Sequence, residues 1–266
     1  MPMADLGDVS IHYEMRGDGP LTYVYCHGLG GSGAGFERED MDWYAERFRT
    51  ISWDNRGLGR SGQAGKYALH LYAGDLARLL DHLEVERAVI FGVSWGGVTA
   101  IKFALDHPQK VAALVLDSTS SESNVRASEN WYMRGELARL GEAALAGRQM
   151  QPAFEGHRTV SAAPQAPQVA PEHIDSYVAE CRTVAGLREH PLTPELHRIT
   201  APTLVVGGGK DEVAGAAGSV IISRQIPGSR LEILQDAGHG TYRQARDEYR
   251  ALLLDFLAEQ GLSNAG

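Results

Sequence analysis

The five residues Gly92-Val93-Ser94-Trp95-Gly96 are the stretch that decides the predicted fold. They follow a short apolar run, residues 88–91, that is typical of a buried strand, and they precede residues 96–107, which are typical of a helix. A serine in such a strand-to-helix turn is held on strained backbone, and the two glycines let neighbouring chain approach without clashing β-carbons. The Ser94 hydroxyl is therefore predicted to point out of the sheet, where it could act as a nucleophile.

The sequence on both sides of this turn alternates between predicted strands and predicted helices. The strands are short apolar runs at residues 50–53, 88–92, 111–116, 203–206 and 231–234. The helices, of which residues 69–83 show the clearest amphipathic spacing, lie at residues 69–83, 96–107, 216–225 and 246–260. This alternation predicts an α/β fold with a mostly parallel sheet covered by helices on both faces. Two further apolar runs, residues 9–13 and 21–26, flank a turn cluster and predict an early β-hairpin.

The alternation stops at residue 118 and resumes at about residue 198. The intervening segment is polar, and three prolines between residues 161 and 171 exclude a regular helix there. An insertion of this length is longer than a plain connection. We therefore expect a core domain of residues 1–117 and 198–266 and a cap, or lid, of residues 118–197 over the active site.

The predicted cap contains several large apolar side chains in an otherwise polar sequence. Trp131, Tyr132, Met133 and Phe154 are the residues concerned. Such a cluster predicts a surface that binds the apolar part of a substrate. Ordinary packing between the helices of the cap is the alternative interpretation.

A serine hydroxyl needs a base that removes its proton and a carboxylate that orients the base. His239 lies between the last predicted strand and the last predicted helix, where parallel sheets place site residues. Asp211 and Asp117 both follow predicted strands, and either one preserves the order Ser, Asp, His. We favour Asp211, because three glycines precede it and its strand is followed by the strand that leads to His239. Asp117 remains the alternative.

A tetrahedral intermediate also needs two N–H donors for its oxyanion. The N–H of Trp95 directly follows the nucleophile. The second donor is expected from the loop His27-Gly28-Leu29-Gly30-Gly31, with Leu29 N–H in that role. His27 is expected to brace the loop.

Together with Asp54-Asn55-Arg56-Gly57-Leu58-Gly59-Arg60-Ser61, these motifs resemble the ordered motifs of the α/β-hydrolase fold family. The resemblance spans nearly the whole chain outside the insertion. It implies a catalytic triad of Ser94, Asp211 and His239 and an oxyanion hole formed by Leu29 and Trp95. It also implies a cap inserted after the sixth strand.

Within that family, the chain resembles two branches. Ser94-Trp95-Gly96-Gly97 and Asp54-Asn55-Arg56-Gly57 are similar to proline iminopeptidases, but Val93 replaces a glycine that these enzymes usually carry. The chain length and compact cap resemble small esterases and lactonases. We therefore expect a serine hydrolase that cleaves carboxylic esters or lactones through an acyl-enzyme. The alternatives are an aminopeptidase, which would need cap carboxylates such as Glu122, Glu129 or Glu136, and a small-molecule receptor with slow turnover.

Composition narrows the choice of partners. A net charge of −9 argues against nucleic acid, and no run approaches the roughly 18 apolar residues of a membrane span. The N-terminal sequence lacks a basic region followed by an apolar stretch, so a cytoplasmic location is expected. Cys26 and Cys181 form neither a disulfide pattern nor a zinc-ligand spacing. A small-molecule substrate is expected, with no cofactor and no metal ion, and the sequence leaves the oligomeric state open.

Overall fold

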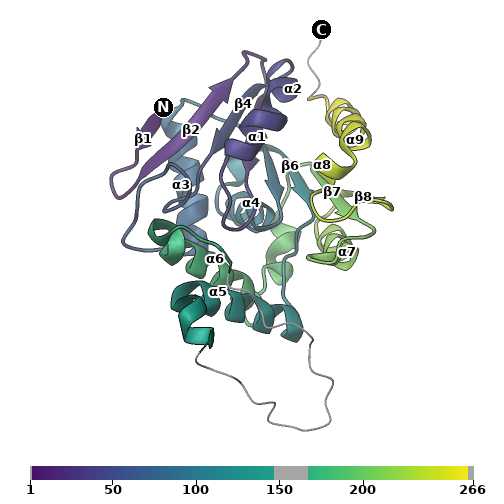
Figure 1. Ribbon diagram of the computed structural model, residues 1–266. Coiled ribbons are helices and arrows are strands. Elements are labelled where there is room, and N and C mark those ends of the chain that lie inside the picture. The colour runs from purple at the N-terminus through teal and green to yellow at the C-terminus, as the bar shows by residue number, and fades with distance from the viewer. Residues whose placement is uncertain (1, 147–166, 263–266) are drawn as a thin grey trace.

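The computed structural model describes residues 2–146 and 167–262. Within these residues, eight strands form one sheet in the order β1-β2-β4-β3-β5-β6-β7-β8 (Figure 1). The strands are β1 (Met3–Asp5), β2 (Ser10–Arg16), β3 (Thr22–Cys26), β4 (Arg49–Trp53), β5 (Ala88–Val93), β6 (Val111–Asp117), β7 (Thr203–Gly208) and β8 (Arg230–Leu234). The six strands from β4 to β8 in the sheet are parallel, while β1 and β2 form an antiparallel edge. The predicted α/β class and mostly parallel sheet are confirmed.

The predicted hairpin between residues 9–13 and 21–26 is wrong. Strand β2 pairs antiparallel with β4, and β3 lies on the other side of β4, so the two strands do not touch as neighbours. The glycines between them serve a different purpose. A β-carbon at Gly17 would lie 2.3 Å from the carbonyl oxygens of Ala45 and Phe48, so this segment crosses closely over the chain that leads into β4.

Alternating side chains of the strands supply two apolar layers, one on each face of the sheet. In β3, Val24 and Cys26 pack with α3 (Leu69–His82), α4 (Trp95–Asp106) and α7 (Gly215–Gln225). Tyr23 and Tyr25 point to the opposite layer, which contains α1 (Ala34–Glu39), α2 (Met41–Ala45) and α9 (Arg246–Glu259). This alternation follows from the two-residue period of a strand. Because the helices cover the two faces of the sheet, the loops at the carboxyl ends of the parallel strands remain available to carry functional residues.

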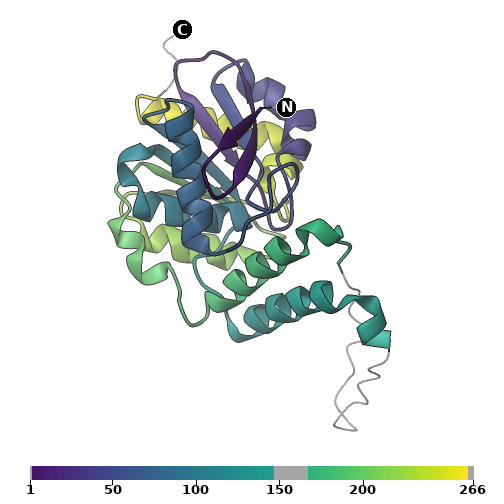
Figure 2. The same ribbon diagram turned by 90° about the vertical axis from the view of Figure 1, so that its left-hand side faces the viewer.

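The predicted cap segment contributes helices rather than strands. Its described elements are α5 (Val125–Ala146), α6 (Ile174–Gly186) and the 3₁₀ helices η2 (Pro171–His173) and η3 (Thr193–Arg198). Helices α5 and α6 lie side by side outside the sheet in both views (Figures 1 and 2) and share a small apolar cluster that includes Tyr177 and Cys181. The division into a core of residues 1–117 and 198–266 and a cap of residues 118–197 remains our proposal. None of the described helices is long and apolar enough to cross a membrane.

Candidate active site

Ser94 lies at the tip of a tight turn between β5 and α4. Its backbone φ is 54° and ψ is −119°, a conformation that is strained for a residue with a β-carbon. The turn depends on its glycines, because a β-carbon at Gly92 would lie 2.3 Å from the Gly96 carbonyl oxygen. One at Gly96 would lie 2.0 Å from the Cys26 carbonyl oxygen. The predicted reason for these two glycines, close approach of neighbouring chain, is therefore what the geometry requires.

The structure brings Asp211 and His239 together. His239 Nδ1 lies 3.0 Å from Asp211 Oδ2 and 3.2 Å from Oδ1. Burial raises the pKa of Asp211, but hydrogen bonds from His239 and from the backbone N–H groups of Val213 and Ala214 outweigh it and hold that pKa below its usual value. An ionised carboxylate at Nδ1 keeps the proton on that nitrogen and leaves Nε2 as the acceptor.

The competing carboxylate, Asp117, is used differently. It is fully buried and accepts hydrogen bonds from Ser118 Oγ and Thr241 Oγ1, both at 2.8 Å, and from the N–H groups of Thr241 and Tyr242. Burial raises the pKa of Asp117, although these bonds lower it. Asp117 therefore holds the short helix α8 (Thr241–Gln244), which follows His239, whereas Asp211 contacts the imidazole ring itself.

The loop after β3 lies beside Ser94, since a β-carbon at Gly28 would be 3.8 Å from the Ser94 β-carbon. The Gly28 carbonyl oxygen accepts hydrogen bonds from His27 Nδ1 (2.9 Å) and Gly31 N–H (3.1 Å). Because N–H and C=O point in opposite directions across a trans peptide, these bonds also fix the direction of the Leu29 N–H. His27 Nε2 accepts from the Asn55 N–H (3.0 Å), so His27 is a neutral brace, and burial lowers its pKa.

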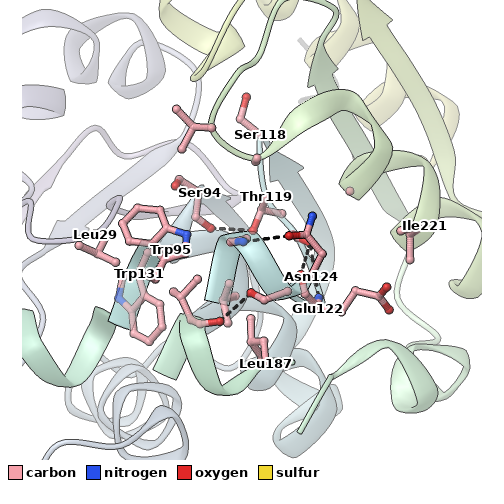
Figure 3. A pocket seen from close by; sticks show the side chains of 18 of the residues that line it. Leu29, Ser94, Trp95, Ser118, Thr119, Glu122, Asn124, Trp131, Leu187 and Ile221 are labelled. Atoms are coloured by element: carbon pink, nitrogen blue, oxygen red, sulfur yellow. Dashed lines mark hydrogen bonds between the residues drawn. The ribbon is translucent and has the colours of Figure 1, made fainter. Parts of the chain in front are cut away.

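Two cavities meet at Ser94, and Figure 3 shows side chains that line the smaller of them. The smaller one, of about 220 Å³, lies between the strand ends and α5 and includes Thr119, Glu122, Asn124, Leu187 and Ile221 in its wall. The other, of about 620 Å³, contains His239, Arg134 and Arg243. Four residues line both cavities, namely Leu29, Ser94, Trp131 and Val213. A substrate bound across Ser94 would therefore have one part on each side.

A sequence-family model described as the alpha/beta hydrolase fold matches residues 24–243. The chain belongs to the α/β-hydrolase fold family. The 3-oxoadipate enol-lactonase 2 of Acinetobacter baylyi is 25% identical over 86% of each chain. A protein named carbamate hydrolase RutD, of Variovorax paradoxus, is 30% identical over 93% of this chain and 96% of its own. The solved structure of a thermophilic esterase from Thermogutta terrifontis superimposes with a TM-score of 0.71, with 25% identity over 97% of this chain and 96% of the esterase.

The four cap residues of this α/β hydrolase that were predicted to bind the apolar part of a substrate lie in different environments. Trp131 lines both cavities at Ser94. Tyr132 is 53% exposed and is absent from the cavity walls, so the structure does not support a substrate-binding role for it. Met133 is 44% exposed and lines only a neighbouring surface groove. Phe154 lies outside the described residues.

Sequence reasoning missed two charged residues of the cap. Arg134 follows Trp131 by three positions and stacks over its ring at 5.6 Å, in the wall of the larger cavity. Glu180 lies on α6 and is fully buried, with hydrogen bonds to the Gly30 N–H (2.7 Å) and Asn55 Nδ2 (3.0 Å). A glutamate between the apolar residues Val178 and Cys181 was a usable signal, because an isolated carboxyl on a buried helix face needs a specific partner.

One buried cluster could hold a cation. His12, Glu37 and Asp54 bring potential ligand atoms within 4.8 Å of one another. The Arg60 guanidinium already lies there, donating to Glu37 Oε1 at 2.7 Å and to Asp54 Oδ2 at 2.8 Å. The guanidinium thus pairs with both carboxylates and offsets one of their two negative charges, so we interpret the cluster as a structural ion-pair network rather than a metal centre.

Glu180 makes the stability of the folded protein depend on pH. Burial raises its pKa to about 8, although Gly30, Asn55 and Trp95 lower it. The folded state therefore keeps a proton that the unfolded state releases, and stability should fall as pH rises from about 4.5 to about 8. We expect Glu180→Gln to remove this contribution, so that the variant gains stability relative to wild type between pH 5 and pH 8. Urea unfolding at several pH values measures it, and parallel curves for the two proteins would contradict the expectation.

Proposed function

We propose that the chain is a serine hydrolase that cleaves carboxylic esters or lactones of small molecules through an acyl-enzyme. The observation that carries the proposal is that His239, whose Nδ1 pairs with the ionised Asp211, lines the same cavity as the strained Ser94. The names of similar proteins, an enol-lactonase and an esterase, support the same reaction class.

In the proposed reaction, Ser94 Oγ attacks the carbonyl carbon while His239 Nε2 accepts the hydroxyl proton. The oxyanion that forms accepts hydrogen bonds from the N–H groups of Leu29 and Trp95. Collapse of the intermediate breaks the bond to the alcohol oxygen, which takes the proton from His239. Water then attacks the acyl-enzyme with His239 again as base, and this releases the carboxylic acid and restores Ser94.

The cap carboxylates disfavour the alternative aminopeptidase. Glu136 is paired with Arg139 and Arg182, and Glu129 is exposed outside the walls of the two cavities. Glu122 does line the smaller cavity, but its Oε2 accepts a hydrogen bond from Thr193 Oγ1 at 2.6 Å. One partly engaged carboxylate is a weak site for a substrate ammonium, whereas an ester or lactone needs none.

Burst kinetics with a p-nitrophenyl ester test the proposal. We expect a burst of p-nitrophenol equal to the enzyme concentration under conditions where deacylation is slow, and a fluorophosphonate should label Ser94 alone. Amino-acid naphthylamides serve as the comparison. Their turnover in preference to esters and lactones would favour the aminopeptidase, and binding of an ester without a burst would favour a receptor.

Trp131 offers a test of substrate selection. It stands in the wall shared by both cavities, so Trp131→Ala joins them and should shift relative kcat/KM across esters of graded acyl length by about 10-fold. Thermal unfolding should change little, because the side chain is partly exposed. Tyr132→Ala, on the same helix but outside the cavity walls, is the matched control. A large loss of Tm with unchanged acyl preference would show that Trp131 only packs the cap.

A further inference from the structure

Helix α6 of the cap contacts the two core loops that follow β3 and β4. Ser176 Oγ donates to the Arg56 carbonyl oxygen at 2.7 Å. The Tyr177 ring packs against Gly30, where a β-carbon would lie 2.5 Å from the ring. Glu180, one helical turn further on, bonds to Gly30 and Asn55. The same face of one helix therefore touches the loop that carries Leu29.

The hydrogen bonds of Glu180 complete a closed chain of hydrogen bonds, here called the ring, that includes residues on both sides of Leu29 in that loop. Gly30 N–H donates to Glu180 Oε2 (2.7 Å), and Asn55 Nδ2 donates to Oε1 (3.0 Å). The Asn55 backbone N–H donates to His27 Nε2, and His27 Nδ1 donates to the Gly28 carbonyl oxygen. The ring thus leaves the loop at Gly30 and returns to it at Gly28, the two residues that flank Leu29.

This arrangement fixes two consecutive peptide planes. The bond to the Gly28 oxygen orients the peptide that contains the Leu29 N–H, and the bond from Gly30 N–H orients the next one. Rotation about the Leu29 backbone would have to break one of them. We infer that Glu180 is a positioning residue of the oxyanion hole, which reaches from the cap to hold the Leu29 N–H in its direction. This inference rests on the proposed function, in which that N–H binds the oxyanion.

Two observations argue that the carboxyl is there for this purpose. Glu180 is completely buried, so its carboxyl group bears the full cost of losing contact with water. Its two oxygens accept hydrogen bonds from Gly30 and Asn55 rather than pairing with a cation. The indole N–H of Trp95, the other predicted oxyanion residue, makes no hydrogen bond of normal geometry within the described part of the chain, yet lies close enough to lower the pKa of Glu180. The carboxyl therefore sits among groups from both halves of the oxyanion hole.

Either protonation state of Glu180 can maintain the ring. A carboxylate accepts from Gly30 N–H and from the Asn55 amide nitrogen, whereas a protonated carboxyl can donate to the Asn55 amide oxygen after that amide turns over. A glutamine can imitate the second arrangement, with its oxygen on Gly30 and its nitrogen on Asn55. Glu180→Gln should consequently preserve the position of Leu29, and Glu180→Ala should not.

The test compares steady-state kinetics of these variants with a p-nitrophenyl ester. Glu180→Ala leaves Gly30 N–H and Asn55 Nδ2 without their partner, and we expect kcat to fall about 10²-fold with little change in KM, the loss that follows from misplacing a group by about 1 Å. Glu180→Gln should restore most of the lost kcat. If Glu180→Ala does not fold, Glu180→Asp, which withdraws the carboxylate by one methylene group, should lower kcat about 10-fold.

Glu136→Ala is the matched control, because it removes a cap carboxylate whose partners among the described residues are Arg139 and Arg182, and so perturbs the cap away from the loop. It should leave kcat unchanged even if Tm falls. Wild-type kcat in folded Glu180→Ala or Glu180→Asp, or an equal loss in Glu136→Ala, would overturn the inference while a wild-type burst still supports the proposed function. A wild-type protein without a burst and without labelling at Ser94 would refute both.

Discussion

Replacement of Ser94 by alanine is expected to lower kcat for a p-nitrophenyl ester by about 10⁶, the loss seen when the nucleophile of a serine triad is removed. A residual acceleration of about 10³ over the uncatalysed reaction can persist, because the N–H groups of Leu29 and Trp95 still bind the oxyanion. Labelling by a fluorophosphonate should disappear together with the burst. Active-site titration and steady-state kinetics on the same preparation measure both effects.

The Ser94→Ala variant should keep its fold. The hydrogen bond that holds the turn, from Thr119 Oγ1 to the Ser94 carbonyl oxygen (2.6 Å), uses the backbone and survives the substitution. Alanine also retains the β-carbon that the turn already accommodates at a φ of 54°. Ser128→Ala, in which the lost hydroxyl donates to the Ala185 carbonyl oxygen on the cap, is the matched control and should label normally. Wild-type rates in Ser94→Ala would end the claim that Ser94 is the nucleophile.

The strands and the turn at Ser94 were predictable because their signals are local. A strand buried on both faces reads as a continuous apolar run, and β5 is such a run, buried throughout. The glycines around Ser94 are required by contacts within a few residues of the turn or with the neighbouring β3. Each of these constraints demands a particular type of residue, apolar in the strand and glycine in the turn, so it can be recognised in the sequence.

The pairing of β2 was not predictable in the same way. Strand β2 lies next to β3 in sequence, and the turn residues between them are those of a hairpin. The pairing partner is instead β4, about 40 residues further along the chain. Residues 9–26 do not indicate that the chain crosses closely at Gly17. A glycine required for close approach of two segments cannot be distinguished in the sequence from a glycine required for a turn.

The glycines before Asp211 have a structural reason beyond the one expected from the sequence. They were expected to let the loop bend toward His239. In the structure, a β-carbon at Gly208 would lie 2.2 Å from the Gly238 carbonyl oxygen, and one at Gly209 would lie 2.6 Å from that of Gln235. Their lack of side chains thus allows the Asp211 and His239 loops to lie against each other. Glu180 was missed because its partners, Gly30 and Asn55, are 150 and 125 residues away in sequence.

The second large effect is expected from Asp211→Asn, and the hydrogen bonds of Asp211 predict how it arises. Oδ1 accepts from the N–H groups of Val213 (2.8 Å) and Ala214 (3.0 Å), so the asparagine oxygen should occupy that position. The amide nitrogen is then left facing His239 Nδ1, where Oδ2 now lies at 3.0 Å. A donor at this point favours the tautomer with its proton on Nε2, which cannot accept the proton of Ser94. We expect kcat to fall by about 10⁴ with the fold intact.

Asp117→Asn distinguishes orientation of the ring from support of its loop. The asparagine oxygen can replace Oδ1, which accepts from Ser118 and Thr241, but the amide nitrogen then opposes the Tyr242 N–H that Oδ2 accepts at 3.0 Å. Two buried donors facing each other should cost about 1–3 kcal/mol of folding stability, while kcat falls far less than in Asp211→Asn because Nδ1 of His239 keeps its carboxylate. Urea unfolding and kcat measured on both variants separate the two effects. A near-normal Asp211→Asn beside an inactive Asp117→Asn would move the acid to the end of β6 and leave Ser94 and His239 in their proposed roles.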